Sequence, residues 1–114
     1  MSTKMNTCST TVLAENHRDL SWDELRQQIG FGNLATISGC RAQREATGAI
    51  VLPVGHGYSV RITLDASDTY NVERIFTRSG VRTCKGIQTN VYADDIGEVA
   101  YRASCYVNVP FGEV

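Results

Sequence analysis

Cysteine and histidine are the first side chains to consider for chemistry in this chain of 114 residues. A thiol enzyme needs a cysteine that is activated by a nearby histidine or by a helix N-terminus. His17 lies near a weakly patterned N-terminal segment, and His56 lies in a Gly-His-Gly segment. The fold could bring His56 to Cys40 or Cys84, but no spacing requires it. We therefore interpret His56 as an exposed loop residue and expect no catalytic residue.

The four cysteines are too scattered to indicate a metal site. They stand at Cys8, Cys40, Cys84 and Cys105. Zinc sites use closely spaced cysteine pairs or histidines at matching distances, and the chain has neither. We expect buried or inert cysteines, no metal and no cofactor. The glycine-containing segments 30–32 and 55–57 do not lead from a strand into a helix, as a phosphate-binding fingerprint requires.

Carboxylates cluster twice along the sequence and could in principle serve acid–base chemistry. Asp65 and Asp68 belong to a polar turn, where aspartate side chains bond nearby amides. Asp94, Asp95 and Glu98 lie at the start of a predicted helix, where negative charge complements the helix dipole. Because each cluster has an ordinary structural role, we interpret both as structural.

Two helices are predicted to frame the chain. Ser21 can cap the first by accepting a hydrogen bond from the amide of Glu24, and Leu20 can pack on Leu25. Gly30 is a typical helix terminator.

The second helix is predicted to begin near Asn90, with Asn90 as its cap, and to end near Cys105. Its buried face would consist of Tyr92, Ile96, Val99 and Ala103.

Between the helices the sequence is typical of extended strands. The predicted strands cover residues 34–41, 48–54, 58–64, 69–78 and 81–88. Apolar and polar residues alternate most clearly in 58–64, and Ser79-Gly80 predicts a tight hairpin turn. The order predicts an α+β fold, an antiparallel meander sheet of four to five strands with a short N-terminal helix and a C-terminal helix packed on one face.

Composition favours one compact domain, with 42% hydrophobic and 20% charged residues. We divide the chain into a flexible N-terminal arm (1–16), a single α+β domain (17–106) and a C-terminal tail (107–114). The longest apolar run, 49–54, is far shorter than the roughly 20 residues that span a bilayer, so no membrane association is expected. The polar first residues lack the apolar core of a secretory signal.

The net charge of −1 hides a basic region in the middle of the chain. Arg74, Arg78, Arg82 and Lys85 fall on the predicted hairpin and are candidate contacts to an anionic partner. A basic hairpin can follow nucleic-acid phosphates or meet an acidic protein surface. The same charges can instead protect an exposed sheet edge from aggregation.

Several sequence blocks carry a family resemblance. They are Gly32-Asn33, 35–39 (ATISG), 60–64 (VRITL), 68–72 (DTYNV), 91–94 (VYAD) and 101–105 (YRASC). In this order they resemble a family of small proteins encoded by tailed bacteriophages, including phages of mycobacteria and related actinobacteria. The resemblance implies a phage product acting in the cytoplasm of an infected bacterium, and it implies no reaction.

These observations predict a non-enzymatic phage accessory protein that binds a host or phage protein. It could also form a small homo-oligomer through an exposed strand edge or through residues 106–111. The alternative is a nucleic-acid-binding protein that uses the basic hairpin.

Overall fold

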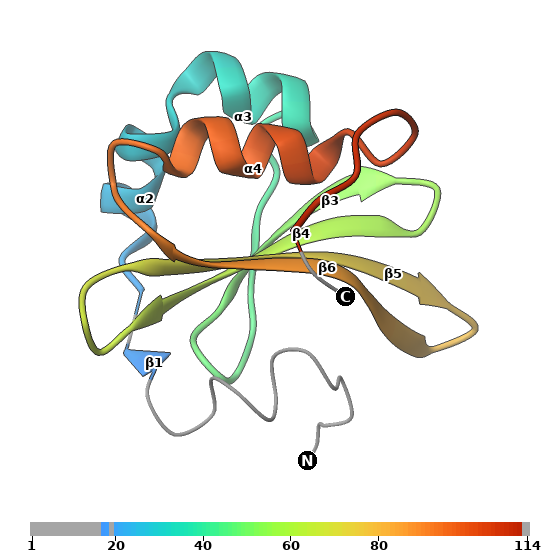
Figure 1. Ribbon diagram of the computed structural model, residues 1–114, viewed down its shortest axis with the longest axis horizontal. Helices are drawn as coiled ribbons and strands as arrows, with labels where there is room; N and C mark the ends of the chain where they lie inside the picture. Colours follow the sequence, from blue (N-terminus) through green and yellow to red (C-terminus); the bar gives the residue numbers. More distant parts are fainter. Residues whose placement is uncertain (1–16, 19, 113–114) are drawn as a thin grey trace.

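A computed structural model describes residues 17, 18 and 20–112 (Figure 1). Its strands are β1 (His17–Arg18), β2 (Gln43–Arg44), β3 (Ile50–Gly55), β4 (Tyr58–Asp65), β5 (Tyr70–Arg78) and β6 (Val81–Val91). Its helices are α2 (Trp22–Ile29), α3 (Phe31–Ser38) and α4 (Ile96–Ser104). The predicted flexible arm, 1–16, falls outside the described residues.

The sheet is antiparallel, and its main path runs in sequence order, β2-β3-β4-β5-β6, with β1 paired to the end of β4. The three helices lie together over one face of this sheet (Figure 1). This confirms the predicted α+β meander with helices on one face. The N-terminal side holds two short helices where one was predicted.

Helix α2 begins as predicted. The Ser21 hydroxyl accepts a hydrogen bond from the Glu24 amide at 3.3 Å. Leu20 and Leu25 are both buried in the core, and Gly30 ends the helix.

The predicted strand at 34–41 is wrong, because most of this segment forms α3. Leu34 and Ile37, one turn apart, are buried against the core. Polar side chains support the turns by bonding carbonyls four residues earlier, Asn33 to Ile29 at 3.1 Å and Thr36 to Gly32 at 3.0 Å. The β-branched and small residues of this segment suggested a strand, but tertiary burial decides for a helix.

Helix α4 begins at Ile96, several residues later than predicted. Asn90 is still part of β6, where it has a φ of +57° rather than a helix-cap conformation. Tyr92 precedes the helix in a turn and is 62% exposed, so its predicted place in the core is wrong. Ile96, Val99 and Ala103 are buried as predicted.

The four remaining strand predictions are confirmed, and β6 extends three residues beyond its predicted end. Ser79 and Gly80 form the tight turn between β5 and β6, both with positive φ. Along β4, Val60 and Ile62 face the helices and belong to the core cluster. Ser59, Arg61 and Thr63 alternate with them and face the opposite side of the sheet, which we call the polar face.

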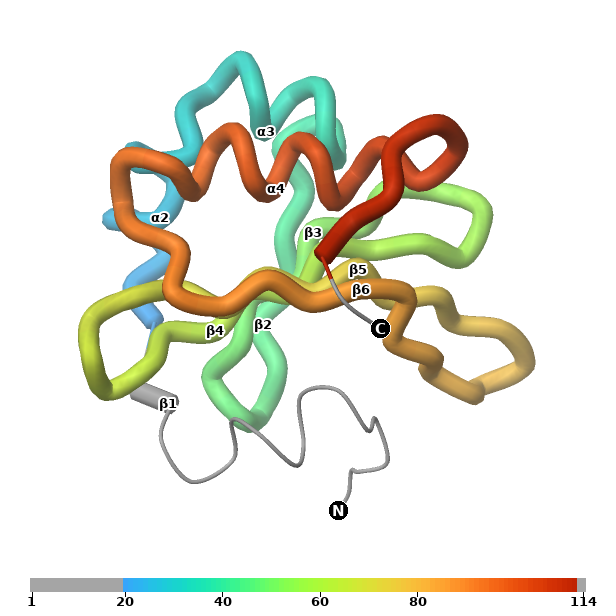
Figure 2. Tube along the Cα trace, viewed as in Figure 1, coloured from blue at the N-terminus to red at the C-terminus, as the bar shows by residue number. Residues whose placement is uncertain are grey.

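The end of the chain returns across β6 (Figure 2). Phe111 is buried in the core, although it belongs to the predicted tail. A Cβ on Gly86 would lie 2.0 Å from the Phe111 carbonyl oxygen, so this crossing depends on glycine.

Candidate binding sites

The structure separates the four basic hairpin residues that the sequence suggested as one anion-binding set. Arg74 is 5% exposed, and its side chain lies under the end of α4. Its guanidinium donates to the carbonyls of Ala103 at 2.7 Å and Arg102 at 2.9 Å. It also lies 5.5 Å from the ring centre of Phe111. Arg74 therefore closes the C-terminal end of α4, where carbonyls have no partner inside the helix.

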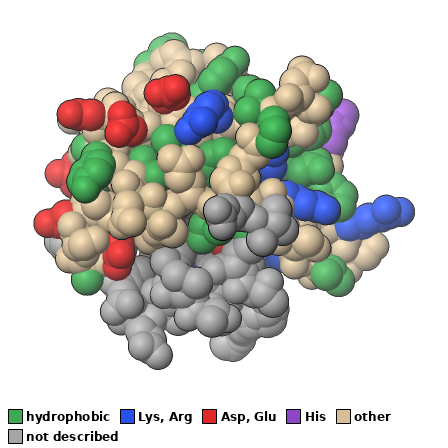
Figure 3. All heavy atoms as spheres, in the orientation of Figure 1, with side chains coloured by type: hydrophobic (Ala, Val, Ile, Leu, Met, Phe, Trp, Pro, Cys, Tyr) green, Lys and Arg blue, Asp and Glu red, His purple; other side chains and the backbone are tan. Residues whose placement is uncertain are grey.

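The other three basic residues divide as well. Arg82 donates to Glu45 at 2.8 Å, and Lys85 lies 5.9 Å from the ring centre of Phe76. Arg78 is exposed next to the hairpin turn. Figure 3 shows most basic side chains at the hairpin side of the view and most acidic ones at the opposite side. The hairpin side thus keeps a basic character, with Arg78 and Lys85 as its exposed cations.

A network of ion pairs crosses the polar face. Arg61 on β4 donates to Glu73 on β5 and to Glu45 after β2, both at 2.9 Å. Glu45 also pairs with Arg82 from β6, so this carboxylate links the segment after β2, at one edge of the sheet, to β6 at the other edge. Sequence reasoning missed the network because Glu45 is 16 residues from Arg61 and 37 from Arg82.

The two carboxylates of this network respond oppositely to their surroundings. Burial is the largest influence on both and disfavours the charged form. For Glu73 burial prevails over the attraction of Arg61 and raises the pKa. For Glu45 burial is outweighed by the combined effect of Arg61 and Arg82, so the pKa is lowered. Glu45 is thus stabilised as a carboxylate, whereas burial makes Glu73 easier to protonate than an exposed glutamate.

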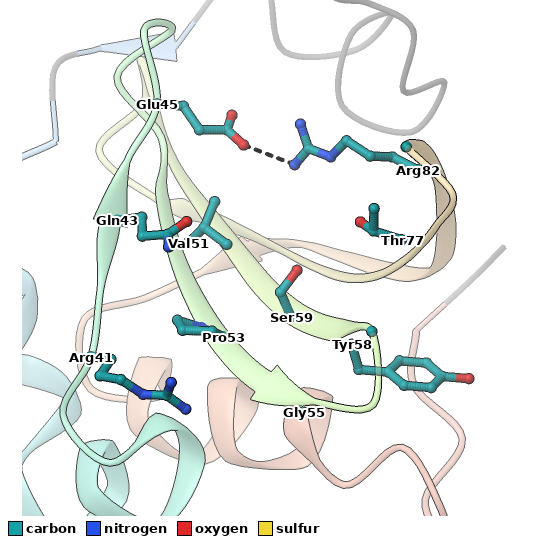
Figure 4. A pocket seen from close by; sticks show the side chains of 12 residues that line it. Arg41, Gln43, Glu45, Val51, Pro53, Gly55, Tyr58, Ser59, Thr77 and Arg82 are labelled. Atoms are coloured by element: carbon teal, nitrogen blue, oxygen red, sulfur yellow. Dashed lines mark hydrogen bonds and ion pairs between the residues drawn. The ribbon is translucent and has the colours of Figure 1, made fainter.

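A hollow on the polar face lies beside this network, and we call it the polar pocket (Figure 4). Its volume is about 530 Å³. Its side chains come from the segment before β3, from β3 and β4, and from the β5–β6 hairpin. They include Arg41, Gln43, Glu45, Val51, Pro53, Tyr58, Ser59, Thr77 and Arg82. The pocket contains hydrogen-bonding groups, charges of both signs and an apolar patch.

A second hollow, the apolar groove, lies at the junction of α2 and α3. It has a volume of about 480 Å³ and is lined by Trp22, Arg26, Gln27, Gly30, Phe31, Leu34 and Cys40. Phe31 is 77% exposed, the highest exposure among the large apolar side chains of the described residues. The sequence carried a weak signal for it, since an aromatic residue between two glycines has few neighbours to bury it.

The remaining candidate groups lie apart from one another. His56 is exposed, with its ring 6.3 Å from that of Tyr106, and no hydrogen bond in the described part of the chain joins it to a cysteine. Cys84 is buried as expected, whereas Cys40 is exposed and Cys105 half-buried. Cys8 falls outside the described residues. Residues 17, 18 and 20–112 contain no cluster of ligands that could hold a metal ion.

The acidic residues lie in a turn and near the start of a helix, where the sequence placed them. Asp65 accepts a hydrogen bond from the amide of Ala66 at 2.7 Å within the β4–β5 turn. Asp94 and Asp95 precede α4, and Glu98 lies in its first turn.

Comparison with protein-family models, curated proteins and solved structures found no match. No helix in the described ranges has the length and apolarity needed to cross a bilayer.

Proposed function

We propose that this chain is a non-enzymatic protein that binds a host or phage protein through the apolar groove. The observation that supports it is Phe31, an aromatic side chain 77% exposed at the edge of a preformed apolar hollow. Its association with a bacteriophage and with the host cytoplasm rests on the sequence resemblance.

Burial of aromatic side chains is a strong source of binding energy in protein interfaces. Trp22 packs partly against the core, and Phe31 lines the same groove with its side chain exposed. The groove therefore has one anchored aromatic side chain and one that a partner can contact. Trp22 and Phe31 lie at the starts of α2 and α3, and the groove is therefore present before a partner arrives. A preformed site loses less conformational entropy on binding.

The polar groups at the groove define the partner further. Gly30 caps α3 without a side-chain hydrogen bond, so the first amides of this helix remain donors. Arg26 lies on the same groove, and its exposed ion pair with Asp23 is weak enough to exchange. The groove suits a protein segment that presents a bulky apolar side chain next to a carboxylate.

The alternative, a nucleic-acid-binding hairpin, loses support from the geometry. Arg74 bonds carbonyls of α4, and Arg82 is paired with Glu45. Arg78 and Lys85 are left as the exposed cations of the proposed set, too few for a groove-reading surface of the expected strength.

Affinity capture with matched variants tests the proposal. Phe31→Asp places a charge in the groove, whereas Val81→Asp places one on an exposed apolar residue at the start of β6. Wild type and Val81→Asp are expected to recover the same protein from a lysate of phage-infected actinobacterial host cells, and Phe31→Asp is expected to lose it. Equal recovery by Phe31→Asp, with an unchanged circular dichroism spectrum, would overturn the proposal, as would no partner for wild type.

A further inference from the structure

The polar pocket is built differently at its two ends. Arg41 stands two residues before β2, and Glu45 stands just after it, so the short strand separates them. β2 pairs with β3 through Gln43 opposite Val51, and the pocket follows this pairing. Figure 4 shows Arg41 at one end of the hollow and the Glu45–Arg82 pair at the other.

The Arg41 end carries a fixed positive charge. The Nε of Arg41 donates to the Ser38 carbonyl at 2.9 Å, and the Ser38 hydroxyl donates to the Arg41 carbonyl at 2.7 Å. These bonds tie the arginine to the end of α3. Its two terminal nitrogens have no acceptor in the described part of the chain and no carboxylate is paired with it there. Such a guanidinium is suited to a phosphate group.

The opposite end offers donors and acceptors held in an ion pair. Glu45 is paired with Arg82 at 2.8 Å and also with Arg61 at 2.9 Å. Only Nη2 of Arg82 is used by this bond, which leaves further N–H donors next to carboxylate oxygens. The hydrogen-bonding edge of a nucleobase also carries donors beside acceptors, so it can pair with this arrangement.

The middle of the pocket can receive a flat, partly apolar body. Val51 and Pro53 form an apolar patch of β3, with the hydroxyls of Ser59 and Thr77 beside it. No described hydrogen bond uses either hydroxyl. The volume of about 530 Å³ lies within the range of small-molecule sites.

We propose that the polar pocket binds a mononucleotide, with its phosphate on Arg41 and the edge of its base on Glu45 and Arg82. The sugar hydroxyls then face Ser59 and Thr77. This site lies on the polar face and shares no lining residue with the apolar groove, so it stands independently of the proposed protein partner.

Calorimetric titration of the whole chain tests the site. The probes are AMP, GMP, CMP and UMP, the matching nucleosides and inorganic phosphate. At least one mononucleotide is expected to bind at least tenfold more tightly than both its nucleoside and inorganic phosphate, because each end of the pocket supplies part of the affinity. If no mononucleotide exceeds inorganic phosphate, the proposal is wrong.

Two matched variants separate the pocket from general charge attraction. Arg41→Gln is expected to weaken the mononucleotide about tenfold and to leave the nucleoside unchanged. Arg78→Gln removes an equal charge from an exposed residue outside the pocket. It is expected to change neither the affinity for the mononucleotide nor that for the nucleoside. An unchanged affinity in Arg41→Gln, or an equal loss in Arg78→Gln, would overturn the assignment.

Discussion

Arg74 illustrates how a charged residue in a strand can serve the fold. From the sequence it belonged to a basic hairpin, because it shares a strand with Arg78. In the structure its side chain reaches the last carbonyls of α4, 28 and 29 residues away in the chain. Contacts of this kind cannot be inferred from local charge patterns, since nothing near Arg74 in the sequence identifies the acceptors.

Replacing Arg74 with alanine is expected to lower the free energy of unfolding by about 3 kcal/mol, because buried carbonyls lose their charged donor and Phe111 loses packing. Arg78→Ala removes an exposed arginine from the same strand and is expected to change the free energy by less than about 0.5 kcal/mol. Urea unfolding of both variants measures the difference. Equal values for the two variants would show that Arg74 does not stabilise the end of α4.

Glu73 and Glu45 should give the chain opposite pH responses. The pKa of Glu73 in the folded chain is raised above its ordinary value of 4.5. The contribution of Glu73 to stability is therefore full below pH 4.5 and is lost as the pH rises through the pKa of the folded chain. The pKa of Glu45 is lowered, so its contribution is present above 4.5 and is lost as the pH falls through the folded value.

Glu73→Gln tests this assignment, because glutamine mimics the protonated acid at every pH. The free energy of unfolding of wild type relative to Glu73→Gln is expected to fall as the pH rises from 4.5 towards neutrality. For Glu45→Gln, the relative free energy should instead change below pH 4.5. Urea unfolding across this range provides both curves, and a Glu73 curve that is flat or rising would contradict the raised pKa.

At the scale of the elements, sequence reasoning succeeded where one face of a strand is buried. The alternation in β4 has a direct physical cause, since successive side chains point to opposite faces of the sheet. It failed for α3, where Leu34 and Ile37 give a short apolar stripe and the polar side chains of Asn33 and Thr36 bond within the helix. Those bonds use residue types that also favour turns, so the local sequence was ambiguous.

Gly97 lies within α4, where helix propensity alone would favour alanine over glycine. A Cβ at this position would lie 2.8 Å from the Ile29 carbonyl oxygen and 2.9 Å from Nδ2 of the Asn33 side chain. Helix α4 therefore approaches the α2–α3 junction closely through this glycine.

Gly97→Ala is expected to lower the free energy of unfolding by about 1–2 kcal/mol, because crowding exceeds the gain in helix propensity. Gly32→Ala in α3 has open space around its Cβ and is expected to raise the free energy by up to about 1 kcal/mol. Thermal and urea unfolding compare the two. A stabilised Gly97→Ala protein would mean that the helices do not pack this closely.

At the scale of the whole molecule, the meander keeps two separate surfaces. The helices cover one face of the sheet and carry the apolar groove, while the polar face carries the ion-pair network and the polar pocket. The network links β6 to the segment after β2 through Glu45 and Arg82. The polar pocket could not be predicted from the sequence, because the tertiary fold brings its residues together from separate segments between 41 and 82. The apolar groove is local, with lining residues between 22 and 40, but it was missed because the second helix of this segment was predicted as a strand.

The central claim is that a protein partner binds at the apolar groove, and site-specific photo-crosslinking tests it most directly. The photoreactive amino acid p-benzoylphenylalanine would replace either Phe31 or Val81, which is also exposed but lies at the start of β6. In phage-infected actinobacterial host cells, illumination is expected to join a specific protein to the chain through position 31 and not through position 81. The absence of an adduct at 31, or the same adducts at both positions, would contradict the claim.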